Sequence, residues 1–290
     1  MTSTQLTQTE GTFTGANGLS LYYQAWCPAR TPLGILALVH GLGEHSSRYA
    51  AIAADFTQAG YAVCAFDNQG HGQSEGQRGH IDSWQDYQEN LRAFLQLVRQ
   101  RQPQAPLFLM GHSLGGLIVL DYVLRYPDAP EVSQLRGLVV SAPPIRPVGV
   151  AKPYRVAIAR LLSGIFPRFS LKVGIDTSGL TRDPEVNREA AADPLVHPYA
   201  TLRWGSETLK TIAWVKRHIA ELGLPMLLIH GEADPIICPQ GSREIFQQIQ
   251  LSDKCLRLYP GAYHEPHNDL DAQQVIHDLL AWLDQHLDNA

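Results

Sequence analysis

Six short apolar runs recur along the chain, each with the length of a single β-strand. They occupy residues 34–40, 61–67, 107–110, 135–143, 225–231 and 255–261. Continuous apolar runs rich in Val, Ile and Leu are typical of strands that are buried on both faces. We therefore expect six strands inside a sheet that is covered on both sides.

Between these runs, apolar residues recur at three- and four-residue spacing, which is the period of an α-helix. This spacing predicts helices at 47–59, 84–100, 114–125, 243–250 and 273–287. The alternation of strands and helices predicts an α/β fold with a mostly parallel central sheet and helices on both faces. The stretch GLSLYYQAW near the amino terminus is expected to give the sheet an antiparallel edge.

The alternation stops at Pro144, in the sequence PPIRP, and resumes near residue 225. Between these points the chain reads as helical and irregular. We interpret residues 144–224 as a cap inserted after a strand, and residues 1–143 and 225–290 as the core. No internal repeat is visible.

The composition narrows the broad class of the protein. The 290 residues are 44% hydrophobic and 18% charged, with a formal net charge of -5, as expected for a soluble globular protein that does not bind nucleic acid. No run approaches the roughly 18 apolar residues of a membrane span, and MTSTQLTQTE lacks the pattern of a secretory signal. The four cysteines have neither metal-ligand spacing nor a disulfide framework. We expect a cytoplasmic protein with reduced thiols and no bound metal.

The charge is unevenly distributed between the cap and the core. Residues 145–217 contain twelve Lys and Arg against six Asp and Glu, whereas the rest contains eleven against 22. From Arg146 to Lys172 there are six basic residues, no acidic residue and several interleaved apolar ones. Such a segment is typical of a helix that lies on an anionic membrane surface, and equally of a solvated helix packed on a core.

The motif Gly-His-Ser-Leu-Gly at residues 111–115 lies between an expected strand and an expected helix. In this context G-x-S-x-G forms a nucleophile elbow, a tight turn that exposes the serine hydroxyl. The flanking glycines allow the strand and helix backbones to pass closely. Ser113 is therefore the candidate nucleophile.

A serine nucleophile needs a base to take its proton and an acid to orient that base. Asp234 follows one expected strand and His264 follows the last one, so both should reach the edge of the sheet where Ser113 stands. The order Ser, Asp, His is that of α/β-hydrolases. Glu232 and His267 lie close by and compete for the same two roles, but the spacing past the strand favours Asp234 and His264.

Acyl transfer also needs N–H donors for the developing oxyanion. Leu114 offers one at the start of a helix, and Leu42, between two glycines in HGLGEH, offers another. The phosphate-binding alternative for this glycine-rich loop lacks the GK[ST] and GxGxxG motifs. A second glycine-rich loop at 67–79, with His71 and Ser74, is expected to use its polar side chains to satisfy turn backbone.

Several motifs together resemble the monoacylglycerol lipase family of α/β-hydrolases. They are HGLGEHSSRY, DNQGHGQSEG, GHSLGG, GEADP and GAYHEPHNDL, and GIDTSGLTRDPEV and DPLVH in the cap extend the resemblance over nearly the whole chain. The elbow alone identifies only a broad superfamily, whereas the combination is much more specific. Two departures concern substrate preference: Leu42 is bulkier than the small residue expected there, and residues 187–192 do not align cleanly.

The resemblance implies a serine esterase that hydrolyses monoacylglycerol to glycerol and fatty acid without a metal or organic cofactor. It implies Ser113, Asp234 and His264 as the triad, and backbone N–H groups of Leu42 and Leu114 as the oxyanion hole. Glu44, Arg48 and His267 match positions near the family's pocket for the glycerol head group; their alternative role is a salt bridge or turn contact at the rim.

Other functions fit the same residues. A lysophospholipase or a broader carboxylesterase would use the same triad, because the triad hydrolyses any ester that fits. A haloperoxidase-like or peptidase activity, a ligand receptor on the same fold and a membrane-tethered scaffold also remain as alternatives. The oligomeric state, acyl-chain length and cap opening have no sequence signal.

Overall fold

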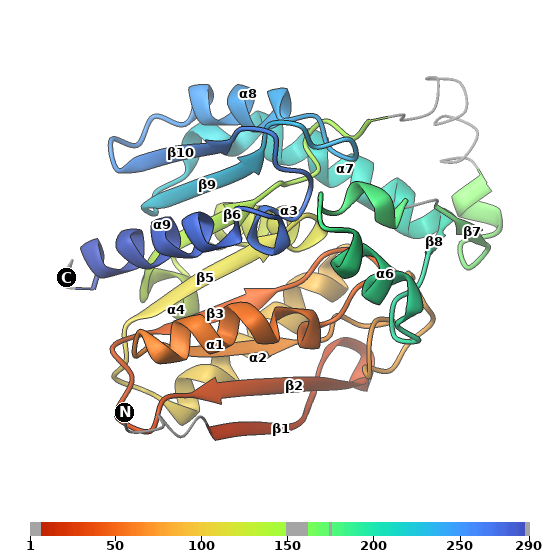
Figure 1. Ribbon diagram of the computed structural model, residues 1–290. Coiled ribbons are helices and arrows are strands. Elements are labelled where there is room, and N and C mark those ends of the chain that lie inside the picture. Colours follow the sequence, from red (N-terminus) through yellow and green to blue (C-terminus); the bar gives the residue numbers. More distant parts are fainter. Residues whose placement is uncertain (1–6, 149–161, 174–175, 288–290) are drawn as a thin grey trace.

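A computed structural model describes residues 7–148, 162–173 and 176–287. Its centre is an eight-stranded sheet in the order β1-β2-β4-β3-β5-β6-β9-β10 (Figure 1). The strands span Thr7–Thr14 (β1), Ser20–Cys27 (β2), Ile35–Val39 (β3), Ala62–Phe66 (β4), Leu107–His112 (β5), Leu135–Ser141 (β6), Met226–Gly231 (β9) and Lys254–Tyr259 (β10). β2 pairs antiparallel with β1 and β4, and the other six strands are parallel. The predicted α/β-hydrolase architecture is therefore confirmed.

The central strands separate two apolar layers. Within β3, Ala37 and Val39 point to one layer, whereas Leu36 and Leu38 point to the other, because successive side chains of a strand face opposite sides. Helices α2 (Gln85–Arg101), α3 (Leu114–Arg125) and α8 (Gln240–Gln248) contribute to the first layer. Helices α1 (Ala50–Gln58) and α9 (Ala272–Gln285) cover the second layer, and Figure 1 shows them together in front of the sheet. All five predicted helices are present within a few residues of their expected ends.

The sequence pattern missed β1. Its residues TQTEGTFT are mostly exposed, so the strand carries no continuous apolar signal. It belongs to the sheet because its backbone pairs with β2 in an unbroken register from Thr7 to Thr14. The predicted antiparallel strand, β2, is thus next to the edge and not at it.

The chain between β6 and β9 adds no strand to the central sheet among the residues described. It contains the small antiparallel pair β7 (Ser170–Lys172) and β8 (Tyr199–Thr201), and helices α6 (Pro184–Ala192) and α7 (Leu202–His218). Two short 3-10 turns of this interval are η3 (Thr177–Gly179) and η4 (Ile219–Glu221). In the rest of the described chain, η1 spans Ala16–Gly18, η2 Ser46–Tyr49, η5 Pro266–Asn268 and the helix α4 Pro130–Ser133. In the predicted basic segment 146–172, residues 149–161 lie outside the described residues.

Helix α7 ties this interval to the core. Ile212 and Val215 lie in the same apolar layer as Leu117 of α3, and the two helices pack against each other. The division of the chain into core and cap therefore stays a prediction, with the carboxyl-terminal half of α7 packed as part of the core. No helix among the described residues combines the length and apolarity needed to cross a membrane.

Candidate active site

Ser113 stands between the end of β5 and the start of α3. Its backbone has φ 50° and ψ -117°, which non-glycine residues rarely adopt. The turn is tight because the strand and helix approach closely: a Cβ on Gly111 would lie 2.3 Å from the Gly115 carbonyl oxygen, and one on Gly115 would lie 2.0 Å from that of Val39. Only glycine fits at both positions, which is the local reason for the predicted elbow.

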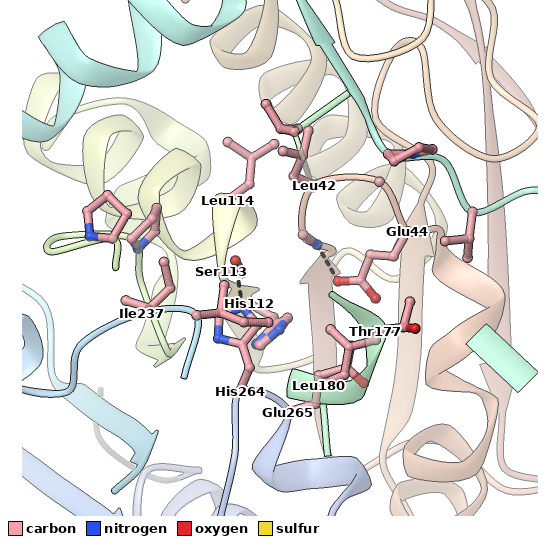
Figure 2. A pocket seen from close by; sticks show the side chains of 18 of the residues that line it. Leu42, Glu44, His112, Ser113, Leu114, Thr177, Leu180, Ile237, His264 and Glu265 are labelled. Carbon is pink, nitrogen blue, oxygen red and sulfur yellow. Dashed lines mark hydrogen bonds between the residues drawn. The ribbon is translucent and has the colours of Figure 1, made fainter. Parts of the chain in front are cut away.

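The structure brings the three predicted triad residues into one hydrogen-bonded chain. His264 Nε2 is 2.9 Å from Ser113 Oγ, and His264 Nδ1 is 2.7 Å from Asp234 Oδ2 (Figure 2 shows the Ser113–His264 contact). Because a carboxylate only accepts, Nδ1 carries the proton and Nε2 can accept from the serine. The three residues follow β5, β9 and β10, whose carboxyl ends meet at one edge of the sheet.

The carboxylate of Asp234 receives four hydrogen bonds. Its Oδ1 accepts from the backbone N–H groups of Ile236 (2.8 Å) and Ile237 (2.9 Å). Its Oδ2 accepts from His264 and from His230 Nε2 at 3.0 Å. Burial would raise the pKa of Asp234, but His264 and the hydrogen bonds outweigh burial and hold the pKa well below its usual range. Asp234 is therefore ionised whenever His264 acts.

The environment of His264 favours its protonated form. Burial alone lowers the pKa of His264, but the charge of Asp234, their hydrogen bond, and the charges of Glu265 and Glu44 raise it above its ordinary value. An imidazolium that forms next to Ser113 is thus stabilised by its surroundings. This is the electrostatic arrangement that a general base needs.

Neither competing residue occupies a triad position. Glu232 is exposed and pairs with Arg243. His267 is buried, and its ring stacks on Tyr49 with centroids 5.2 Å apart. Burial lowers the pKa of His267 to about 4, so the ring is neutral near pH 7. Within the described part of the chain, neither ring nitrogen of His267 has a hydrogen-bond partner.

The two predicted oxyanion donors flank Ser113. Leu114 is the first residue of α3, where the N–H groups of a helix have no partner within the helix. Leu42 lies in the loop after β3, and a Cβ on Gly41 would be 3.1 Å from Ser113 Cβ, so this loop runs directly beside the serine. Figure 2 shows Leu42 and Leu114 on the same side of Ser113. Their placement is compatible with two N–H groups that converge on one oxygen atom.

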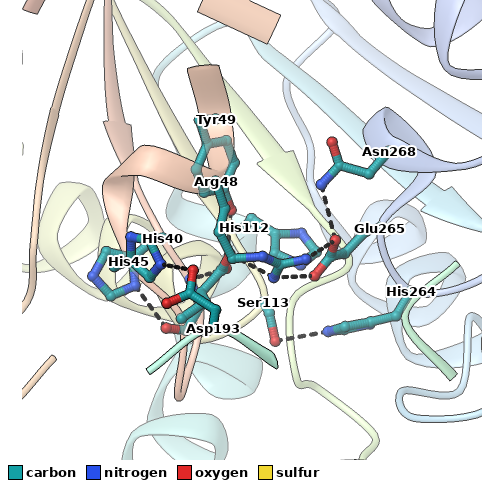
Figure 3. A network of polar contacts seen from close by, with 12 residues as sticks. His40, His45, Arg48, Tyr49, His112, Ser113, Asp193, His264, Glu265 and Asn268 are labelled. Atoms are coloured by element: carbon teal, nitrogen blue, oxygen red, sulfur yellow. Dashed lines mark hydrogen bonds and ion pairs between the residues drawn. The ribbon is translucent and has the colours of Figure 1, made fainter. Parts of the chain in front are cut away.

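A buried cluster of charges lies beside the triad (Figure 3). Arg48 binds Glu265 in a bidentate manner, at 2.7 and 2.9 Å, and contacts Glu44 at 3.2 Å. Glu44 also accepts from Tyr49 Oη at 3.0 Å and from the backbone N–H of Gly41 at 2.5 Å. Burial raises the pKa of Glu44 despite the charge of Arg48. The pKa of Glu265 is held below its usual value because Arg48 outweighs burial there.

Glu265 is the residue of this cluster that the sequence analysis missed. It directly follows His264, and its only signal in the sequence was that adjacency. Through Glu44, the cluster holds the loop that carries Leu42, because the Gly41 N–H is fixed by the Glu44 carboxylate. The expected salt bridge of Arg48 is thus present, between two carboxylates.

Two contacts connect the predicted cap to the loop after β3. His45 Nε2 lies 2.9 Å from Asp193 Oδ2, and the backbone N–H of His197 donates to the Gly43 carbonyl at 2.9 Å. The loop at 67–79 is held as expected by its own polar groups. In particular, Ser74 Oγ donates to the Asp67 carbonyl, and the Asp67 carboxylate accepts from backbone N–H groups.

A cavity of about 680 Å³ opens beside Ser113. Most of its lining is apolar, including Leu42, Leu114, Leu180 and Ile237, whereas Glu44, Arg48 and Glu265 are charged. Figure 2 shows the four apolar side chains together with Glu44 and Glu265 around the serine. A cavity of this size holds a drug-sized or lipid-sized molecule. His267 is absent from the described lining, and the described residues contain no group of His, Cys, Asp and Glu suited to a metal ion.

Comparison with known proteins gives consistent matches over the whole fold. Residues 30–271 match the sequence model of a family described as serine aminopeptidase, S33. The monoacylglycerol lipase of Mycolicibacterium smegmatis is 33% identical over 97% of this chain and 99% of its own. The monoglyceride lipase of Rattus norvegicus is 32% identical over 94% of this chain and 89% of its own. The crystal structure of Paleococcus ferrophilus monoacylglycerol lipase superposes with a TM-score of 0.80 at 32% identity, covering 97% of this chain and 99% of that one.

Proposed function

Because this chain belongs to the serine aminopeptidase S33 family, and within it to the monoacylglycerol lipases, we propose that it hydrolyses monoacylglycerols to glycerol and fatty acid. The observation that carries the proposal is the position of the Ser113 hydroxyl. It is hydrogen-bonded to His264 and lies in the wall of a mostly apolar cavity with charged groups. Such a cavity suits a molecule with a long apolar part and a short polar part.

The proposed reaction runs in two acyl-transfer steps. His264 Nε2 takes the proton of Ser113 as its oxygen attacks the ester carbonyl carbon, and the oxyanion accepts hydrogen bonds from the N–H groups of Leu42 and Leu114. His264 then returns the proton to the departing glycerol oxygen, which leaves an acyl-serine. A water molecule, deprotonated by His264, then attacks the acyl carbon. The bond to Ser113 Oγ breaks, the fatty acid is released, and His264 returns the proton to Ser113 Oγ.

We assign Glu44, Arg48 and His267 to the surroundings of the glycerol head group, the first two as lining residues and His267 as a residue that supports them. Glu44 and Arg48 line the cavity, so their polar atoms are within reach of a hydroxyl group. His267 is not among the described residues that line the cavity, and within the described chain its two ring nitrogens have no hydrogen-bond partner. Its contribution is therefore the stacking that supports Tyr49, which in turn donates to Glu44.

The charge cluster disfavours the aminopeptidase reaction that the family description names. A peptide amino terminus needs a carboxylate that is free to bind its ammonium group. Here Glu44 and Glu265 share Arg48, and both are buried. An ester with an uncharged head group makes no such demand.

The test is fatty-acid release from a panel that contains monoacylglycerols of several chain lengths, a diacylglycerol, a lysophospholipid and a short soluble ester. We expect preference for monoacylglycerols and loss of nearly all turnover in Ser113→Ala. Preference for lysophospholipid or for the short ester would replace the proposal with a lysophospholipase or a carboxylesterase. If no substrate of the panel is hydrolysed, a ligand receptor on the same fold becomes the favoured function.

We also propose that the cap contacts the membrane surface where such substrates dissolve. Four apolar side chains near β7 are largely exposed: Ile165 (63%), Phe166 (59%), Phe169 (58%) and Leu171 (44%). Arg168 and Lys172 lie among them, as in an interfacial segment that binds anionic lipid.

The free state of all four cysteines supports the reducing environment of the cytoplasm.

Sedimentation with vesicles of phosphatidylcholine and phosphatidylglycerol tests the membrane contact. The double change Phe166→Asp and Phe169→Asp should lower vesicle binding more than tenfold. It removes apolar area that would be buried in the membrane, and it adds negative charges that the anionic lipid repels. Leu33→Asp is the matched control, since Leu33 is also exposed (43%) but lies before β3, outside the cap. Equal binding by all three proteins would exclude the contact.

A further inference from the structure

One wall of the cavity is a single face of helix α7. Gly205, Thr208, Leu209 and Ile212 line the cavity, together with Trp204. Relative to Gly205 they are spaced at three, four and seven residues, which places them on one side of an α-helix. Side chains at all of these positions, including 205, therefore project toward the cavity.

This wall is on the apolar side of Ser113. Ile212 and Trp204 belong to the same apolar layer as Leu114 and Leu42, which flank the serine. The charged lining residues come from other elements, namely the loop and turn after β3 and the loop after β10. An acyl chain whose ester lies at Ser113 would therefore extend along α7, away from the charge cluster.

Gly205 is unusual because neither its backbone nor its packing requires glycine. It lies inside a helix, where glycine is less favourable than any residue except proline, and its φ is negative. Among the described residues, no heavy atom beyond its own helix lies within 4 Å of where its Cβ would stand. By contrast, a Cβ on Gly116 of α3 would touch Val140 at 3.3 Å and Pro143 at 3.4 Å.

We infer that Gly205 determines substrate specificity: the missing side chain keeps open the part of the cavity that takes the distal carbons of the acyl chain. The inference rests on the proposed function, since it concerns the same cavity and the same ester. A larger residue at 205 would extend into this space, since the first carbon of its side chain would meet no described atom within 4 Å. It would shorten the acyl-chain site and leave the reacting groups untouched.

The expected effect follows from the volume that is filled. A leucine adds four carbon atoms, comparable to four methylene groups of a substrate. Each methylene buried in an apolar site contributes about fourfold in binding. Exclusion of four of them would lower kcat/KM for a long substrate by up to ~200-fold, and a chain that bends to avoid the leucine would lose less.

The experiment compares wild type, Gly205→Ala, Gly205→Leu and the control Gly223→Leu on monoacylglycerols with 8 to 18 acyl carbons. Gly223 also has open space around its Cβ position but does not line the cavity. In Gly205→Leu, kcat/KM for the longest substrate that wild type accepts should fall at least ~10-fold, with the 8-carbon substrate unchanged within about twofold. Gly205→Ala should raise Tm by about 2 °C, because alanine favours the helix.

The outcomes separate the inference from the proposed function. If wild type hydrolyses monoacylglycerols and Gly205→Leu lowers all chain lengths equally or none, the inference is wrong and the proposed function stands. If wild type hydrolyses none of them, the proposed function fails, but displacement of a fluorescent fatty acid by fatty acids of 8 to 18 carbons still measures the length of the site. Unchanged displacement by long fatty acids in Gly205→Leu would overturn the inference by this second route.

Discussion

Replacing Ser113 with glycine is expected to give a more stable protein than replacing it with alanine, although both changes remove the proposed nucleophile. The backbone of Ser113, at φ 50° and ψ -117°, has the angles of the first central position of a type II′ turn, where glycine dominates. Neighbouring contacts fix this conformation, since the Ser113 N–H donates to the Ser141 carbonyl at 2.8 Å and the Leu117 N–H donates to the Ser113 carbonyl at 3.1 Å. The fold therefore holds serine in a backbone conformation that serine disfavours, whereas glycine adopts this conformation without strain.

The magnitude is a difference between two opposing quantities. A residue held in a sparsely populated region costs ~1–3 kcal/mol. Glycine removes this cost, but its unfolded chain is more flexible, which costs ~0.5–1 kcal/mol. The free energy of unfolding should therefore rise by about 1 kcal/mol in Ser113→Gly relative to Ser113→Ala, which corresponds to a Tm higher by about 2 °C. Comparison with alanine cancels the lost hydroxyl group, because both variants lack it.

Urea and thermal unfolding of the two variants measure the difference. Ser141, at the end of β6, is the matched control: it is buried, and its φ is not positive. There the order should reverse, so that Ser141→Gly is less stable than Ser141→Ala by ~0.5–1 kcal/mol. If Ser113→Gly were no more stable than Ser113→Ala, the turn would store no strain, and the argument from its backbone angles would be refuted.

Three further predictions concern the charges around the triad. Arg48→Met should lower the free energy of unfolding by ~3–5 kcal/mol, because it leaves the buried Glu265 without its cation. The value of kcat/KM should rise with pH through an apparent pKa above 6.5, since His264 acts as a neutral base and its pKa is raised. In Asp234→Asn this rising limb of the pH profile should move to lower pH, and kcat/KM should fall by up to ~10⁴-fold. His230→Leu should lower kcat and move the same limb to higher pH, because Asp234 loses a hydrogen-bond donor and its charge acts more strongly on His264.

Each of these predictions has a control in the chain. Arg168→Met breaks an exposed pair with Asp82 and should change stability by less than ~1 kcal/mol. A similarly small effect of Arg48→Met would mean that the buried cluster is not stabilised by its cation. For the pH profiles, His277 is exposed and its ion pair is with Asp278, so His277→Gln should leave the pH dependence of kcat/KM unchanged. An unshifted limb in Asp234→Asn would show that His264 is not the titrating group.

The body of the fold was predictable because its strands are covered on both sides. Burial on two faces requires continuous apolar runs, and these runs are visible in the sequence for all six parallel strands. The triad candidates were predictable for a related reason, since carboxyl ends of parallel strands meet at one edge. The spacing past the strand and the family resemblance favoured Asp234 over Glu232, and in the structure Glu232 is exposed and pairs with Arg243.

Features that depend on backbone pairing or on distant contacts left no pattern in the sequence. Strand β1 is held by its hydrogen bonds to β2 and buries little of its own surface. The pair His45–Asp193 joins residues 148 positions apart, and the bidentate pair Arg48–Glu265 joins residues 217 positions apart. The residues of such pairs are common polar types, and in the sequence their positions look like those of surface residues. Their spacing along the chain therefore does not predict the pairs.

These distant contacts converge on the loop that carries Leu42. On one side Glu44 fixes the N–H of Gly41, and Glu44 is itself held by Arg48. On the other side the N–H of His197, from the chain before α7, binds the carbonyl of Gly43. Because the proposed oxyanion donor lies between Gly41 and Gly43, its direction depends on both contacts. Loss of either contact would therefore change the direction of the Leu42 N–H, and with it the geometry of the proposed oxyanion hole.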